Sequence, residues 1–279
     1  MGREAGRRRA AAVLVVIAGA VGGPLGASAS TTGAPDSTTT TPASASGARQ
    51  LPAVAVVGQS AEVTTRIKNS TLAGMVEVVV SMTTVVTAVN PADGSYTTRS
   101  TIGTVDVPVG AEIAGDGVNA LVARSFEQSF QANGAAVPAA STLIDAASMT
   151  PEQQASGRDL IDAVSLISIG FPAEPVAVGA AWTADGTIGR HGTIIPVSYQ
   201  CRLIALDAAT YTMEVTYTQA FSQPSDAGAI EATIAGWGTI VGSVSNPLSL
   251  SATLHQSVDG IQGVEPLNND TAITFDGTG

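Results

Sequence analysis

Apolar and polar residues alternate with a period of two over most of the chain. In the segment from Met75 to Val89, one face carries the large apolar side chains and the other carries Thr83 and Thr87. The apolar face includes Val78, Val80 and Met82. This period is typical of a β-strand with one buried face, so a long strand is predicted here.

Further segments with this alternation follow, separated by clusters of turn residues. They predict strands at Tyr96–Val107, around Phe126 and Phe130, at Ala135–Leu143, from Trp182, at Tyr199–Ala205, Tyr211–Phe221, Ala229–Gly242 and Pro247–Val258, and a short one at Thr271–Phe275. Asn133-Gly134 predicts a tight hairpin, Asp259-Gly260 predicts a turn, and Pro138 places its strand at a sheet edge. About nine or ten strands with short connections predict one wide antiparallel sheet, and so wide a twisted sheet must curl or close.

One segment has helical spacing instead. Thr150-Pro151-Glu152-Gln153 has the form of a capping box with proline at the first helical position. Leu160, Ile161 and Val164 then recur on one face, which predicts an amphipathic helix over Pro151–Ser168. We expect this helix to pack on the rim or open face of the sheet. The predicted fold class is therefore mainly β, a half-barrel or barrel-like sheet with one main helix.

The N-terminal region reads as an export signal followed by a leader. Residues 1–29 combine a cationic start, an apolar run and an A-x-A cleavage pattern, so cleavage is expected between Ala29 and Ser30. A retained membrane anchor is the alternative. Residues 30–50 are rich in Ser, Thr and Pro and predict a flexible leader, which leaves residues 51–279 as a single antiparallel β domain. The expected location is outside the cytoplasm, secreted or associated with the cell envelope.

Charge and cysteine content narrow the function classes. The formal net charge is −11, from 12 Lys and Arg against 23 Asp and Glu, which argues against a nucleic-acid partner because phosphate contacts need clustered cations. Cys201 is the only cysteine, so an internal disulfide and a zinc or iron–sulfur cluster are excluded. It falls on the apolar face of its strand, where burial as a small hydrophobe is expected.

No catalytic constellation is found. His191 and His255 are not spaced as metal ligands, and no nucleophile elbow, phosphate loop or paired carboxylates occur. We therefore expect no metal, no cofactor and no enzyme, with a hydrolase left open. Asn268-Asn269-Asp270 favours a solvated turn over a calcium site. For Trp182 and Trp237, core packing is favoured over stacking on a sugar.

One stretch carries a resemblance. Pro175-Val176-Ala177-Val178-Gly179-Ala180-Ala181-Trp182 followed by Tyr199–Asp207 resembles an uncharacterised family of exported proteins and lipoproteins of high-GC Gram-positive bacteria, whose outline is P-V-x-V-G-A-x-W. More distantly, the layout resembles LolA and LppX-type lipoprotein carriers, whose half-barrel holds lipid on a concave apolar face. This resemblance implies a lipid-binding half-barrel. The chain lacks the lipidated cysteine of the lipoprotein members.

Strand patterning and resemblance together lead to a functional hypothesis. The predicted apolar-ligand face consists of Val78, Val80, Met82, Phe126, Phe130, Met213, Val215 and Tyr217. Either the curled sheet fills its own interior, or it keeps a trough of several hundred Å³, the usual scale of ligand sites, and we expect the trough. The predicted function is an envelope protein that binds a lipid or other apolar ligand; the alternative is a ligand-free structural or interaction module. We expect a monomer with no stable membrane span after cleavage.

Overall fold

The computed structural model describes residues 47–71, 74–109, 119–190, 193–223, 229–263 and 265–278. The predicted signal peptide with its cleavage position at Ala29 and Ser30, most of the predicted leader, and His191 lie outside these residues. The described strands are β1 (Ser60–Thr71), β2 (Gly74–Val89), β3 (Tyr96–Val109), β4 (Ser125–Phe130), β5 (Ala136–Leu143), β6 (Ala181–Arg190), β7 (Thr193–Leu206), β8 (Thr210–Gln223), β9 (Ile230–Ser243), β10 (Leu250–Gln262) and β11 (Glu265–Thr278). A 3-10 turn, Ala146–Ser148, precedes the helix α3, Pro151–Ser165.

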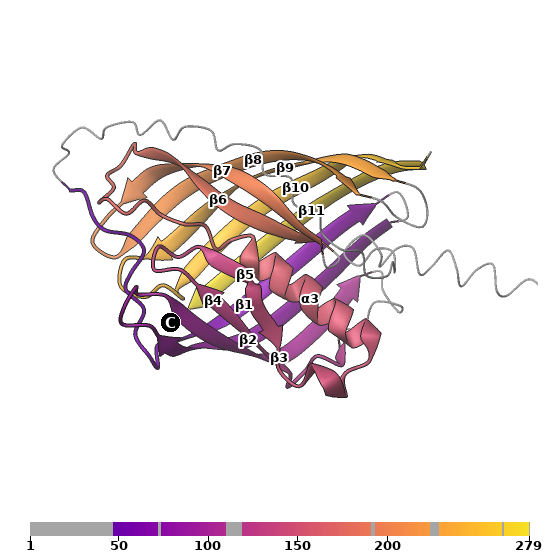
Figure 1. Ribbon diagram of the computed structural model, residues 1–279, viewed down its shortest axis with the longest axis horizontal. Helices are drawn as coiled ribbons and strands as arrows, with labels where there is room; N and C mark the ends of the chain where they lie inside the picture. The colour runs from indigo at the N-terminus through magenta and orange to yellow at the C-terminus, as the bar shows by residue number, and fades with distance from the viewer. Residues whose placement is uncertain are drawn as a thin grey trace, which may run out of the picture.

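All eleven strands form one antiparallel sheet in the order β5-β4-β3-β2-β1-β11-β10-β9-β8-β7-β6. Consecutive strands pair with each other except β5 and β6, which form the two edges of the sheet; the first and last strands, β1 and β11, also pair and so join the two halves. The sheet curls until its edge strands β5 and β6 approach each other, and α3 lies in the remaining opening (Figure 1). The predicted fold class, a barrel-like antiparallel sheet with one main helix on it, is confirmed.

Hydrogen-bonded register defines the face that the sheet turns inward. Across β1 and β2, Val63 lies opposite Met82 and Ile67 opposite Val78, and all four side chains are buried. Because side chains on a strand alternate, the residues between them point outward. The inward row continues without interruption through β11, β10, β9 and β8, where Met213 lies opposite Ile240. The core therefore sits inside the curled sheet.

Four details differ from the sequence prediction. Strand β1 is not among the predicted strands, because Thr65 and Asn69 occupy two of its inward positions and interrupt the apolar alternation. Strand β11 is much longer than the predicted Thr271–Phe275. The predicted turn at Asp259-Gly260 is wrong: β10 runs through it to Gln262 and the turn falls at Gly263, whose φ is 62°. The helix ends at Ser165, before the predicted Ser168.

The capping box at the start of α3 is confirmed. The backbone N–H of Gln153 donates to Thr150 Oγ1 (3.3 Å), and the backbone N–H of Thr150 donates to Gln153 Oε1 (2.9 Å). These bonds satisfy two amide groups, one that the helix leaves free and one at the cap itself. Leu160, Ile161 and Val164 are buried against the sheet.

The segment after α3 joins the two edges of the sheet. We call Leu166–Phe171 the closing segment. On the β5 side, Ser168 O accepts from the Ala136 amide (3.2 Å) and the Phe171 amide donates to Asn133 O (2.9 Å). On the β6 side, Trp182 Nε1 donates to Gly170 O (3.0 Å). The seam at this end is therefore held by main-chain hydrogen bonds to β5 and the turn before it, and by one indole hydrogen bond from β6.

Candidate ligand cavity

The eight predicted ligand-face residues all lie on the inner face and all are buried. They come from β2 and β4 in one half of the sheet and from β8 in the other half. Met82, Phe130 and Met213 line a cavity between the sheet and the closing segment. The other five, Val78, Val80, Phe126, Val215 and Tyr217, pack in the core beside it.

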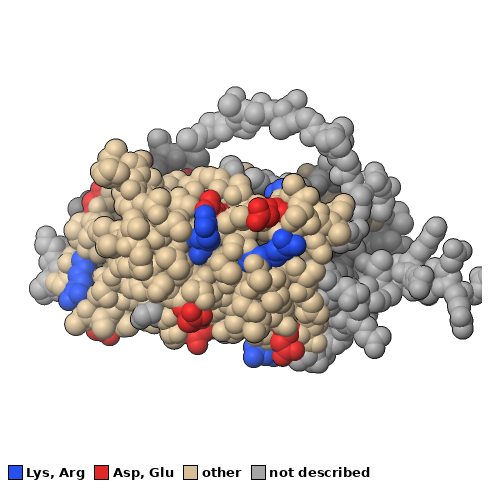
Figure 2. Space-filling model, turned by 90° about the horizontal axis from the view of Figure 1, so that it is seen from below, with Lys and Arg blue, Asp and Glu red and all other residues tan. Residues whose placement is uncertain are grey.

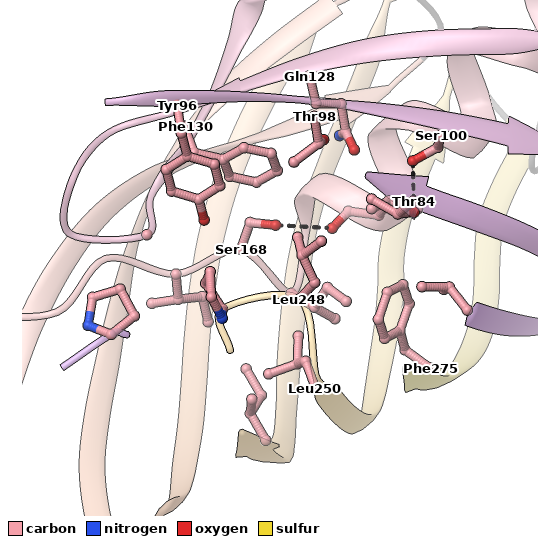
Figure 3. A pocket seen from close by; sticks show the side chains of 18 of the residues that line it. Thr84, Tyr96, Thr98, Ser100, Gln128, Phe130, Ser168, Leu248, Leu250 and Phe275 are labelled. Carbon is pink, nitrogen blue, oxygen red and sulfur yellow. Dashed lines mark hydrogen bonds between the residues drawn. The ribbon is translucent and has the colours of Figure 1, made fainter. Parts of the chain in front are cut away.

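The cavity has a volume of about 80 Å³ and lies near the end of the barrel where the β2–β3 and β4–β5 turns are found. Its apolar wall includes Met82, Met213, Ile240, Leu250 and Phe275. Ser168, Ile169 and Phe171 of the closing segment form part of the remaining wall. Figure 3 shows Leu250 and Phe275 across the space from Tyr96 and Thr98.

The opposite wall is polar. Thr84, Thr98 and Ser100 on β2 and β3, and Gln128 on β4, are buried and face the cavity (Figure 3). Thr84 and Ser100 hydrogen-bond each other (2.8 Å between the hydroxyl oxygens). Gln128 Nε2 donates to Ser165 Oγ (3.1 Å), and Ser165 Oγ donates to Ile161 O (2.9 Å), which ties the polar wall to α3.

These polar lining residues were missed by the sequence prediction. Thr98 and Ser100 alternate with exposed residues from Tyr96 onward, so their inward position could be read from the period of β3. That Thr98 and Ser100 share a cavity with Tyr211 depends on the closure of the sheet, and no local sequence pattern predicts it.

The cavity is far smaller than the expected trough of several hundred Å³. Aromatic side chains on one strand cover glycines on its neighbour and fill the interior. A Cβ atom at Gly236 would lie 2.2 Å from Tyr217 Cζ, one at Gly242 2.2 Å from Tyr211 Cζ, and one at Gly186 2.5 Å from Tyr199 Cε2. The predicted trough is thus largely occupied by the protein's own tyrosines.

Burial of these rings changes their titration. Desolvation raises the pKa of Tyr96, Tyr199, Tyr211 and Tyr217 well above the ordinary value of 10.0. The phenols are therefore neutral at physiological pH. They can donate a hydrogen bond, and they add no charge to the interior.

The charged side chains that form ion pairs lie on outward positions of the sheet. Within the part of the chain that the structure describes, the ion pairs are Arg66–Glu77, Lys68–Glu77 (3.8 Å) and Arg99–Glu127 (2.7 Å), on outward positions of β1 to β4. Figure 2 shows the face seen from below, where basic and acidic groups are few and several lie next to each other. Among the residues that the structure describes, no Lys, Arg, His, Asp or Glu lines the cavity.

The residues considered as metal ligands or as a reactive thiol lie apart from one another. The described residues include no group of three or more His, Cys, Asp or Glu that could hold a metal ion. Cys201 is buried as predicted, and desolvation raises the pKa of its thiol to about 12. The predicted turn at Asn268-Asn269-Asp270 is wrong: the three residues belong to β11, with Asn269 buried inward and its two neighbours exposed.

The two tryptophans differ. Trp182 packs against Phe171 (ring centroids 5.4 Å apart), which confirms the core-packing interpretation. Trp237 is 52% exposed on the outer face and stacks on His255 with centroids 5.3 Å apart, so its predicted burial is wrong. Its flanking residue Gly236 leaves room for Tyr217 on the inner face instead.

The residues behind the resemblance have structural roles. Val176 is buried and pairs with Arg49 through two main-chain hydrogen bonds (2.8 and 2.9 Å). Gly179 has a φ of 91°, which favours glycine, and its amide donates to Leu203 O (2.8 Å). The stretch therefore anchors the chain to β7 before β6 begins.

We compared the chain with family models, curated proteins and solved structures. No family model matches this chain, and no curated protein or solved structure matches it either. Among the described residues, no helix has the length and apolar character needed to cross a membrane.

Proposed function

We propose that this protein is an exported protein of the cell envelope that binds an apolar ligand of the lipid class inside its curled sheet. The observation that carries the proposal is the cavity between the inner face and the closing segment, with an apolar wall from β2, β8, β9, β10 and β11. Ligand sites are typically concave, mostly apolar and supplied with a few polar groups, and this cavity has that composition.

A long acyl chain needs more room than about 80 Å³, so binding requires movement of part of the wall. Helix α3 is the part suited to move. It is held to β5 and β6 along the seam, whereas the strands are held to each other by continuous ladders. In this proposal α3 and the closing segment act as the cover of the site.

The alternative function is a ligand-free structural or interaction module. The filled interior favours it, because the tyrosine–glycine pairs occupy space that a lipid carrier would leave open. The resemblance to exported lipid carriers remains a prediction, and the proposal does not depend on it.

Native mass spectrometry of the protein purified from its own host, followed by solvent extraction, tests the proposal. We expect an adduct of lipid mass that solvent removes. A clean apo mass, together with an unchanged melting temperature on addition of acyl lipids, would favour the structural module.

A matched pair of helix variants tests the role of α3. A Cβ atom at Gly157 would lie 2.7 Å from Leu143 Cδ2 on β5, so Gly157→Leu should push α3 away from that strand. Ala155 is exposed on the same helix, so Ala155→Leu is the control. We expect Gly157→Leu to lower the fraction of protein that retains lipid by several-fold and Ala155→Leu to leave it unchanged. Equal retention in both would rule out α3 as the cover.

A further inference from the structure

Polar side chains line the cavity with atoms for which the described residues provide no hydrogen-bond partner. Tyr96, Thr98, Gln128 and Tyr211 line it, and all are at least nine-tenths buried, with 6%, 1%, 2% and 5% of their surface exposed. They come from β3, β4 and β8, so both halves of the sheet contribute. Figure 3 shows the Tyr96 hydroxyl and the side chains of Thr98 and Gln128 directed to the same space.

The contacts of the two tyrosine rings and of the Gln128 amide leave three side-chain atoms without a hydrogen bond to a described residue. Tyr96 stacks on Phe130 (4.9 Å between centroids), and Tyr211 meets Phe171 edge to face (5.1 Å), but within the described chain neither hydroxyl has a hydrogen-bond partner. Gln128 uses its Nε2 group on Ser165, which leaves Oε1 as an acceptor. These atoms border the cavity, so a molecule bound there can form the hydrogen bonds that the described chain does not supply.

The chemistry of the cluster selects an uncharged partner. Tyr96, Tyr211 and Thr98 offer hydroxyl donors, and Gln128 offers an amide oxygen. A carboxylate or phosphate buried here would lose its hydration, and the described lining residues offer no cation to compensate, so the free-energy cost is large. A hydroxyl group, in contrast, can both accept from these hydroxyls and donate to Gln128 Oε1, and an ester carbonyl can accept from the hydroxyls.

We infer, on the basis of the function proposed above, that this cavity binds the neutral, oxygen-bearing head group of a lipid of the acylglycerol class. The head group occupies the polar wall, and the acyl chain begins along Met82, Met213 and Leu250, under the cover of α3. Lipids with an ionised head group bind more weakly at this position.

Binding of three probes of equal chain length to the delipidated protein tests the inference. The probes are 1-monodecanoylglycerol, decanoate at pH 8 and decane. We expect 1-monodecanoylglycerol to bind at least about tenfold more tightly than either of the others, because it alone is uncharged and can hydrogen-bond the cluster. Equal affinity for all three, or tightest binding of decanoate, overturns the inference and leaves the proposed function standing. Binding of none overturns both.

Two variants connect the selectivity to the cluster. Tyr96→Phe and Thr98→Val each remove one hydroxyl, and each should weaken binding of 1-monodecanoylglycerol about 3- to 10-fold while leaving decane unaffected. Because the described residues provide these hydroxyls with no hydrogen-bond partner, the melting temperature of the apo form should stay the same or rise. Thr216→Val, at an exposed position of β8, is the matched control and should change neither quantity. Unchanged binding in both cavity variants would show that the cluster does not contact the head group.

Discussion

At the residue scale, glycine and tyrosine on neighbouring strands act as pairs. Gly236 has no Cβ, and Tyr217 extends over it to donate from its hydroxyl to Gln256 Oε1 (2.8 Å) on the strand beyond. The ring of Tyr217 also meets Tyr199 edge to face, with centroids 5.2 Å apart. Small residues on the inner face thus allow large ones to lie flat and span two strands.

This pairing predicts the effect of a single methyl group. In Gly236→Ala the new Cβ would lie 2.5 Å from Tyr217 Oη, so the ring must move and its hydrogen bond is disturbed. We expect a loss of about 1–3 kcal/mol in the free energy of unfolding, measured with urea.

The control is Gly103→Ala on β3, where the nearest atom to the new Cβ, Ser81 O, is 3.5 Å away. It should leave stability unchanged within about 0.5 kcal/mol. In a double-mutant cycle, replacing Tyr217 by Ala should remove most of the penalty at Gly236. A full penalty in the absence of the Tyr217 ring would contradict the pairing.

Cys201 gives a second prediction at this scale. Its thiol is buried, and burial raises its pKa to about 12, so both access and thiolate formation are suppressed. A maleimide should fail to label the native protein at pH 7.5 over an hour and should label it fully in denaturant. Rapid labelling without denaturant would place Cys201 on the outer face of β7.

At the scale of elements, α3 depends on its cap and on its position between two sheet edges. The helix has 15 residues, and isolated helices of that length are marginal in water, so tertiary packing and capping provide most of its stability. The closing segment fixes its C-terminal end, and Thr150 with Gln153 fixes its N-terminal end.

Thr150→Ala tests the cap. It removes the acceptor of the Gln153 amide, and we expect a loss of about 1 kcal/mol in the free energy of unfolding. Thr150→Ser keeps the hydroxyl oxygen and should recover most of that loss. If both variants were equally stable, the cap would contribute nothing to the fold.

At the scale of the whole molecule, the neutral interior determines how stability depends on pH. Five groups on the inner face, four tyrosines and Cys201, have pKa values raised by desolvation. In the unfolded chain they lose their protons near their ordinary values of 9.0 and 10.0, whereas the folded protein keeps them protonated. Within that pH range the folded state binds more protons, so stability falls as pH rises.

We therefore expect stability to be insensitive to these groups below about pH 8 and to decline above it. Each group contributes up to about 1.4 kcal/mol per pH unit between its unfolded and folded pKa values. Urea unfolding from pH 8 to 11 measures the decline. Cys201→Ala should reduce its slope most between pH 8.5 and 9.5, because the ordinary pKa of the thiol, 9.0, lies below that of the phenols. A stability that stays constant up to pH 11 would show that the five groups are solvated.

The sequence by itself determined the strands with regular alternation, the helix with its capping box and the inward face of β2, β4 and β8. These features follow from local rules, because a period of two or of 3.6 fixes which side chains share a face. Prediction of strands from the sequence failed where an inward position is polar, as at Thr65 and Asn69 in β1. It also failed where a strand passes through a glycine, as at Gly260.

Only the tertiary structure decided how the halves of the sheet meet and what fills the interior. Pairing of β1 with β11 joins residues from opposite ends of the chain, and no local pattern encodes that pair. Closure brings Tyr96 of β3 and Tyr211 of β8 to one cavity and places Tyr217 over Gly236, which reduces a predicted trough to about 80 Å³. The physical reason is that packing depends on distances between strands remote in sequence, whereas alternation specifies only the face on which a side chain lies.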